Sequence, residues 1–415
     1  MKLKVRVFVW IIGCVIFFIT FTKVARVGVV TNKQGSDEFV SDLDLVHQAR
    51  REHVQRVCQQ RPSEFKVWAD LSRYFSFSDR HRLVYCSVQK VGCSFWLQVM
   101  KILTGQLPQG SLYQGSFYHT VGMRGHYSFR GKPPSEKRRL LDTYKKFMFV
   151  RDPYARLFSA YMDKVFNPTR QMRMILRHSE TFRTHDTRAI ARELECATNV
   201  SFRNFVQTLL SSKGKWFDPH FTHMFRHCDP CSVHFDYIGK METFVVDAKY
   251  ILDKAGVDGK LLTASEELFR SGNEILAIRD FANGILFFRR SKNCKPTYLC
   301  EIYLRIWVTL QTRGLISTEV LYPFPLDNCS SAYVSYPIEE LVKAHMMSGN
   351  RSVRMRQRQA AMMEAYYSIP RSLLKELQKF AQDDCDLFGY ECSVDVRFPE
   401  DRYTPSNYSF FRQFW

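Results

Sequence analysis

Hydrophobic and polar positions along the chain first predict a strand–loop–helix unit. The apolar run LVYCSV at 83–88 is short and includes β-branched residues, which is typical of a buried strand. After the loop 89–93, Ser94 opens a predicted helix whose apolar residues recur at helical spacing, namely Trp96, Val99, Met100 and Leu103.

The same arrangement recurs further along the chain. FMFV at 147–150 predicts a second buried strand, followed by Arg151-Asp152-Pro153 and by a helix with Leu157, Tyr161 and Val165 on one face. Two strand–loop–helix units of this kind predict an α/β fold, with a central parallel sheet flanked by helices in a single domain.

The rest of the chain gives weaker signals. An amphipathic helix is predicted over 371–388, with Pro370 leading it. The polar stretch 23–79 is expected to be a stem with some helix over 43–57, residues 80–395 the folded domain, and 396–415 a C-terminal tail. The stretch from about 250 to 350 carries no nameable motif.

The N-terminus has the pattern of a membrane anchor. An uncharged apolar run covers 7–22, with basic residues before and after it. A cleaved signal peptide is the alternative, but no good small-residue cleavage site follows the run. Sequons at Asn199, Asn328, Asn350 and Asn407 favour a lumenal body, so residues 1–6 are expected to be a cytosolic stub and the anchor to be of type II.

Charge and cysteine content narrow the possible partners. The formal net charge is +19, from 60 Lys and Arg against 41 Asp and Glu. This excess predicts attraction to nucleic acid, an acidic membrane or an anionic polysaccharide, and the anchor and sequons argue against nucleic acid. One basic stretch, 164–192, suits an anionic partner. A second group, Arg351, Arg354, Arg356 and Arg358, is interpreted as a solvated helix face.

Of the 12 cysteines, Cys14 lies in the apolar run, which leaves an odd number for the lumen and predicts a free thiol or an intermolecular bridge. Cys228 and Cys231 form a CxxC. Structural disulfides are favoured over redox activity for this pair, and a zinc site would need a second pair that the sequence lacks. No metal-ligand cluster is apparent, so no metal is expected.

The two loops carry the candidate chemistry. A helix that begins directly after a tight loop offers free N–H groups and a positive dipole end to an anion, and Lys90 with Ser94 suits a phosphate or phosphosulfate. An ordinary loop with a solvated lysine is the alternative. Arg151, with Ser159 and Arg156 nearby on the next helix, suits a phosphomonoester. The alternative there is a structural Arg151–Asp152 ion pair.

Several segments together resemble one family. QKVGCSF at 89–95 and RDPYARLFSAY at 151–161 resemble the 5′-phosphosulfate and 3′-phosphate motifs of the membrane-bound carbohydrate sulfotransferases. The subgroup is the one containing chondroitin and dermatan 4-O-sulfotransferases and glucuronyl 3-sulfotransferases. Its further blocks are similar to 220–231, 237–243 and 369–391. Three positions depart from the family pattern, namely Gln89, Gly92 and Phe221. The segment from about 250 to 350 is a divergent insertion that does not align with the family.

The resemblance implies transfer of a sulfuryl group from 3′-phosphoadenosine 5′-phosphosulfate (PAPS) to a glycan hydroxyl by in-line displacement, in the Golgi membrane. A glycosaminoglycan or glycoprotein glycan is the expected acceptor, and an anionic one is favoured. The implied cofactor-binding residues are those of the two motifs: Gln89, Lys90, Val91, Gly92, Cys93, Ser94, Phe95, Arg151, Asp152, Pro153, Tyr154, Ala155, Arg156, Leu157, Phe158 and Ser159.

Lys90 is also expected to be catalytic, as the cation at the leaving group. The general base is expected among the histidines, in the order His119, His220 and His126. Two other functions compete with this interpretation. A nucleotide phosphotransferase lacks support, because the Walker lysine–serine pair and Mg²⁺ carboxylates are missing. A non-catalytic lumenal glycan-binding protein with the same fold would be distinguished only by its lack of activity.

Overall fold

The computed structural model describes residues 35–62, 65, 70–108, 127–167, 200–212, 218–259, 261, 274–290, 297–324, 336–402, 409–412 and 414. The chain divides into two compact units, residues 1–46 and residues 47–415. The sheet and the candidate site belong to the second unit. The expected stub and anchor, 1–6 and 7–22, lie outside the described residues. Within the described part, no helix is long and apolar enough to cross a membrane.

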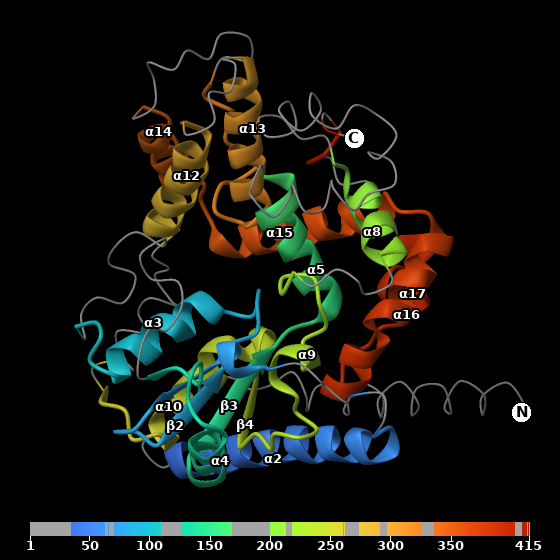
Figure 1. Cartoon of the computed structure of the whole chain (residues 1–415). Coiled ribbons are helices and arrows are strands. Elements are labelled where there is room, and N and C mark those ends of the chain that lie inside the picture. The colour runs from blue at the N-terminus through green and yellow to red at the C-terminus, as the bar shows by residue number, and fades with distance from the viewer. Residues whose placement is uncertain are drawn as a thin grey trace, which may run out of the picture. The chain divides into compact units, whose positions relative to one another are not determined.

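The sheet has four strands in the described part of the chain, in the order β1 (Phe75–Ser78), β2 (Leu83–Cys86), β3 (Lys145–Val150) and β4 (Tyr237–Lys240) (Figure 1). The β2–β3 and β3–β4 pairs are parallel, with Tyr85 opposite Phe147 and Phe147 opposite Tyr237. The predicted parallel sheet is therefore confirmed for these three strands.

Strand β1 corrects the prediction, because it pairs antiparallel with β2, Phe75 lying opposite Cys86. A short connection at 79–82 joins the two strands, and a connection of that length permits only antiparallel pairing. The sheet is therefore mixed. It also begins within the stretch 23–79 that was expected to be a stem.

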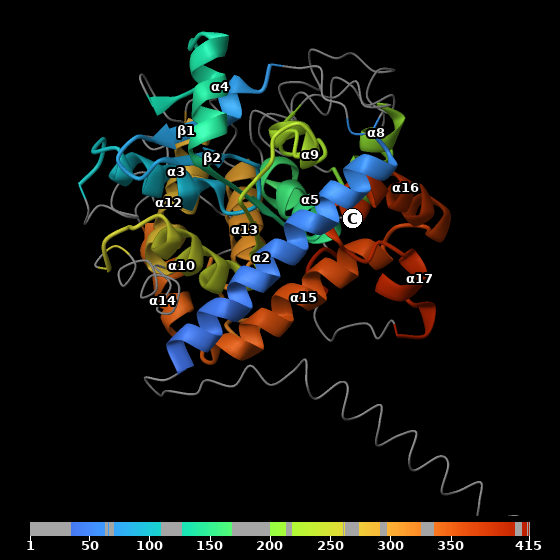
Figure 2. The same cartoon turned by 90° about the horizontal axis from the view of Figure 1, so that it is seen from below.

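Both predicted helices follow their strands. Helix α3 (Cys93–Leu103) follows β2, and α5 (Pro153–Tyr161) follows β3 and continues into the π-helical turn η5 (Met162–Phe166). Trp96 of α3 packs on the sheet, its ring centroid lying 4.6 Å from that of Phe147. Helix α10 (Phe244–Lys254) lies beside α3 (Figures 1 and 2), and Phe244 packs against Phe95 with ring centroids 5.5 Å apart.

The remaining elements include long helices after the sheet. Helix α16 has the predicted bounds, Arg371–Phe388. An apolar core joins residues of α5, α8 (Phe202–Ser211), α13 (Thr297–Thr312), α15 (Arg351–Tyr367) and α16, and Tyr161, Phe202 and Tyr366 are fully buried in it. The other elements are α2 (Gly35–Gln60), η1 (Ser72–Tyr74), α4 (Pro134–Thr143), α9 (Phe225–Cys228), η7 (Met241–Thr243), α12 (Glu274–Arg290), α14 (Tyr336–Met346), α17 (Val394–Arg397) and η10 (Glu400–Arg402).

The interpretation of 351–358 as a solvated helix face is wrong for Arg354. This side chain is buried, and its guanidinium donates hydrogen bonds to the carbonyl oxygens of Gly314 at 2.9 Å and Gly349 at 2.7 Å. It also forms an ion pair with Glu274 at 2.7 Å. The charge pattern alone could not reveal two of these partners, since Gly314 and Glu274 lie 40 and 80 positions earlier in the chain.

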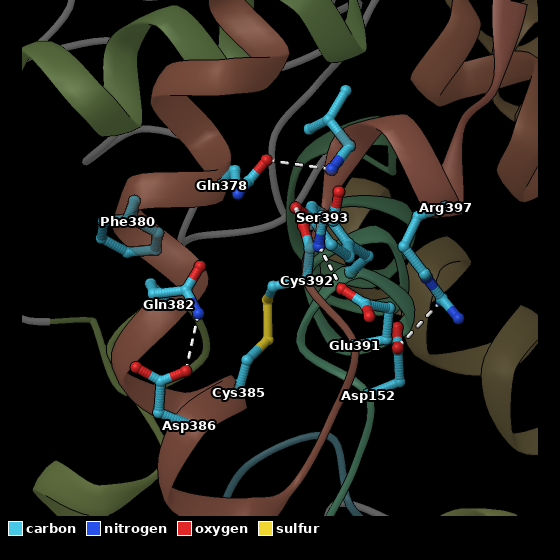
Figure 3. The surroundings of a disulfide bond; sticks show 12 residues. Asp152, Gln378, Phe380, Gln382, Cys385, Asp386, Glu391, Cys392, Ser393 and Arg397 are labelled. Atoms are coloured by element: carbon cyan, nitrogen blue, oxygen red, sulfur yellow. Dashed lines mark hydrogen bonds and ion pairs between the residues drawn. A yellow bond between two sulfur atoms is a disulfide. The ribbon is translucent and has the colours of Figure 1, made fainter.

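Disulfide bonds cross-link segments of the folded domain. Cys58 of α2 is bonded to Cys231, Cys86 of β2 to Cys228, and Cys385 of α16 to Cys392 (Figure 3). The two cysteines of the CxxC thus have different partners, which confirms their structural interpretation. Among the described residues Cys93 is a free thiol. Because of the first bond, part of the expected stem is covalently tied to the folded domain.

Candidate functional site

The loop between β2 and α3 has the backbone of an anion site. Lys90 and Gly92 both have positive φ, 70° and 81°, and helix α3 begins at Cys93, one residue before the predicted start. No side chain caps this helix start, so its first N–H groups can serve a ligand. A left-handed lysine costs roughly 1–2 kcal/mol, a strain that is common in functional loops.

Gly92 is required in this loop for two reasons. Its φ is one that other residues rarely adopt, and a Cβ atom there would lie 2.7 Å from Cε2 of Phe244. The glycine that departs from the family pattern is therefore matched to the phenylalanine at the start of α10.

The loop between β3 and α5 is fixed by a helix cap. Asp152 Oδ1 accepts a hydrogen bond from the Ala155 N–H at 2.8 Å, and Pro153 occupies the first turn. Asp152 Oδ2 forms an ion pair with Arg397 at 2.8 Å (Figure 3). The carboxylate is thus engaged by Ala155 and Arg397, and the alternative of a structural Arg151–Asp152 ion pair is not what the described residues form.

Arg151 joins the two loops. Its Nη1 donates a hydrogen bond to the carbonyl oxygen of Lys90 at 3.3 Å, at the carboxyl ends of the adjacent parallel strands. Burial, together with the charge of Arg358, lowers the pKa of Arg151 to about 10, so the side chain remains a cation at neutral pH. Ser159, two turns into α5, is half-buried, and its hydroxyl makes no hydrogen bond to the described part of the protein.

Arg156 has its donors engaged by main-chain carbonyls. Nε donates to Gln89 at 2.9 Å, Nη1 to Thr222 at 2.7 Å and Nη2 to Pro219 at 3.1 Å. The guanidinium thereby connects the loop between β2 and α3 to the block 219–222. Arg156 therefore stabilises the relative position of these two segments.

The other motif residues mostly pack. Val91, Phe95, Leu157 and Phe158 are buried apolar side chains, and the hydroxyl of Tyr154 donates to the carbonyl of Cys392 at 2.7 Å. Cys93 Sγ donates to Gln89 Oε1 at 3.4 Å. Such residues shape the two loops, and Ser94 remains half-buried in the first turn of α3.

A cation cluster that the sequence did not predict surrounds Asp163, in the turn η5. Its carboxylate lies 2.9 Å from Lys90 Nζ, 3.3 Å from Lys164 Nζ and 3.3 Å from Arg313 Nη2. Burial lowers the pKa of Lys90, and the charges of Arg313 and Lys164 add to this effect while Asp163 opposes it. Arg358 in turn contributes to the lowered pKa of Arg151. No sequence signal links Arg313 to Asp163, because Arg313 follows Asp163 by 150 positions.

His220 is the candidate base that the structure describes, whereas His119 and His126 lie outside the described residues. Its Nδ1 lies 2.7 Å from Oδ1 of Asp218. Burial lowers the pKa of His220, the nearby charges of Lys164 and Lys90 lower it further, and Asp218 opposes them. The sequence prediction missed Asp218, although an acidic residue two positions before a candidate base is a visible signal.

The donor set of the site suits an anion. Across the described ranges, no group of three or more His, Cys, Asp or Glu side chains is arranged to hold a metal ion. Lys90, Arg151 and the uncapped start of α3 converge at one edge of the sheet, and the hydroxyl of Ser159 is available. These residues fit a ligand that carries more than one anionic group.

Comparison with known proteins finds similarity to sulfotransferases. A model described as "Sulfotransferase family" matches residues 73–280, which is half of the chain. Carbohydrate sulfotransferase 14 of Danio rerio is 30% identical over 233 residues, 54% of this chain and 62% of that protein. Carbohydrate sulfotransferase 11 of Mus musculus is 29% identical over 246 residues, 54% and 65% respectively. Carbohydrate sulfotransferase 8 of Mus musculus is 32% identical over 192 residues, 46% and 45%.

The chain thus spans less than two thirds of the length of these curated relatives. No solved structure matches it significantly. The resemblance to carbohydrate sulfotransferases that the motifs predicted is confirmed. Because the family model covers half of the chain and includes both strand–loop–helix junctions, this protein belongs to the sulfotransferase family.

Proposed function

We propose that this protein transfers a sulfuryl group from PAPS to a hydroxyl of a glycan. The observation that carries the proposal is the hydrogen bond from Arg151 to the main chain of Lys90, which joins the two anion-binding loops at one sheet edge. Open α/β sheets bind their ligands at that edge. The names of the curated relatives, all carbohydrate sulfotransferases, support a glycan as acceptor.

The proposed donor site uses both loops. Lys90 and the N-terminus of α3 would hold the phosphosulfate, and Arg151 with the Ser159 hydroxyl would hold the 3′-phosphate. When bound, PAPS supplies an activated sulfuryl group. The task of Lys90 is to place a positive charge where negative charge develops on the leaving phosphate. Arg156 keeps the loop in register with the block 219–222 through its three carbonyl contacts.

His220 is the general base in this proposal. Its lowered pKa keeps the imidazole neutral near pH 7, so it can accept the proton of the acceptor hydroxyl. With Nδ1 bonded to Asp218, Nε2 is the atom left to take the proton. Asp218 would then stabilise the imidazolium that forms. The expectation that His119 is the base stays a prediction.

The acceptor and compartment belong to the proposal as well. Lys164, Arg313 and Arg358 add positive charge beside the donor site, which supports an anionic acceptor. The disulfides favour an oxidising compartment, and Asn350 of one sequon is exposed at the start of α15. A lumenal domain held in the Golgi membrane by residues 7–22 is consistent with both observations.

Incubation of the purified protein with radiolabelled PAPS and a panel of desulfated glycosaminoglycans tests the function. Transfer of label to at least one glycan, lost in Lys90→Ala, is the expected result. If the protein binds PAPS but labels no member of the panel or of a glycoprotein set, it is a non-catalytic glycan-binding protein instead.

A further inference from the structure

Asp163 lies at the centre of the cation cluster without a place in the mechanism above. It belongs to the π-helical turn η5, directly after the helix that carries Ser159. Turns of this type occur frequently at functional sites. Its two carboxylate oxygens have different partners, since Oδ2 lies 2.9 Å from Lys90 Nζ and Oδ1 lies 3.3 Å from Arg313 Nη2.

The partners of Asp163 come from distant parts of the chain. Lys90 belongs to the loop after β2, while Arg313 follows α13, beyond the residues 73–280 that the family model matches. The Arg313 guanidinium also lies over the ring of Phe281, 4.1 Å from its centroid. Lys164 completes the set, 3.3 Å from Oδ2. One carboxylate therefore neutralises part of the charge of three cations.

The charge balance of this cluster has a consequence for acid–base chemistry. The charges of Lys90, Lys164 and Arg313 outweigh burial and hold the pKa of Asp163 well below its usual range. The carboxylate therefore stays ionised and is a poor proton acceptor. Its remaining effects are to orient the cations and to repel an approaching anion.

We propose that Asp163 is a positioning residue that acts as an internal counter-ion: it aligns Lys90 and Arg313 in the nucleotide-free enzyme and yields part of both contacts to the phosphosulfate. This inference rests on the proposed donor site. Asp163 reduces nucleotide affinity, because its negative charge competes with the ligand for the same cations. It increases turnover, because it fixes the Lys90 ammonium where charge develops on the leaving group.

The test compares Asp163→Asn, which removes the charge, with Asp163→Glu, which retains it. We expect Asp163→Asn to bind 3′-phosphoadenosine 5′-phosphate at least threefold more tightly than the unmodified protein and to have at least tenfold lower kcat. Asp163→Glu should recover more than half of both changes. Affinity is measured by calorimetry and by the nucleotide-induced shift in Tm, which remains readable for a destabilised variant.

Glu339→Gln is the matched control. It removes one negative charge from a surface pair with Arg279 on α12 and should leave nucleotide affinity and kcat within twofold. Unchanged or weaker nucleotide binding by Asp163→Asn would overturn the inference, whatever its turnover. A failure of the unmodified protein to bind the nucleotide would instead overturn the proposed function, so the two failures are distinguishable.

Discussion

Nδ1 of His220 lies 2.7 Å from Oδ1 of Asp218, and the same carboxylate oxygen accepts the main-chain N–H of His220 at 2.8 Å. Two contacts to one oxygen fix both the ring and the backbone that carries it. The imidazole is therefore oriented before any acceptor binds, which is the arrangement a general base requires.

We expect His220→Ala to lower kcat by about 100-fold or more while nucleotide affinity changes by less than threefold, because a general base acts on the acceptor and not on the donor. Rapid-quench turnover and calorimetry measure the two quantities. His234→Ala, at an exposed position, is the control. His119→Ala is measured in parallel: if it abolishes turnover and His220→Ala keeps more than a tenth, the role belongs to His119.

Stability should decrease in acid because of His227. Burial, aided by the charge of Arg156, lowers the pKa of this histidine to about 3 from 6.5. Between pH 3 and pH 6.5 this histidine is protonated in the unfolded chain but not in the folded protein. The contribution of His227 to the free energy of unfolding is therefore fully present above pH 6.5 and is lost as the pH drops toward 3. Urea titrations at several pH values measure the slope, which should be shallower in His227→Gln. An equal slope in His227→Gln and the unmodified protein would contradict this account.

Arg151→Ala should weaken binding of 3′-phosphoadenosine 5′-phosphate by about 10- to 150-fold, since a charge-assisted hydrogen bond is worth roughly 1.5–3 kcal/mol. Binding of adenosine 5′-phosphosulfate, which lacks the 3′-phosphate, should change much less. Arg226→Ala removes an exposed arginine and serves as the control. An equal loss of affinity for both nucleotides would mean that Arg151 binds the phosphosulfate or only maintains the structure of the loop.

Gly92→Ala should destabilise the protein and abolish donor binding, because it adds a Cβ atom 2.7 Å from Phe244 at a φ of +81°. Gly256→Ala is a close match, with a φ of +64° and no atom within 4 Å of the new Cβ. It should lower the free energy of unfolding only by the cost of a left-handed backbone at an alanine, roughly 1–2 kcal/mol. Thermal unfolding compares the two, and similar losses would mean that the Phe244 ring can move aside.

The elements predictable from the sequence were those with a local pattern. The β2–α3 and β3–α5 units each lie within about 20 consecutive residues, and the helix 371–388 was predicted at its observed bounds. Their apolar spacing fixed both type and order. Because β2 and β3 are parallel neighbours, their carboxyl ends lie side by side, and this places Lys90 near Arg151 as expected.

Contacts between distant segments could not be predicted in this way. Arg313 lies in a stretch without a motif, and its partner Asp163 sits on a turn whose π-helical geometry has no periodic signature. Arg354 resembled a surface arginine because its partners Gly314 and Glu274 lie 40 and 80 positions away in the sequence. Strand β1 was missed because serine alternates with phenylalanine in FSFS at 75–78, which lacks the continuous apolar run that marks β2.

The three carbonyl contacts of Arg156 have a consequence for how this protein can diverge. One guanidinium bonds to Gln89 on the donor side and to Pro219 and Thr222 beside His220, and the Cys86–Cys228 disulfide ties the same two segments. In the proposed function, the separation between the β2–α3 loop and His220 is thus set by the fixed dimensions of a planar group and a covalent bond. Within the described residues, helices α12 to α14 contribute none of these four bonds, so substitutions on those helices are expected to leave that separation unchanged.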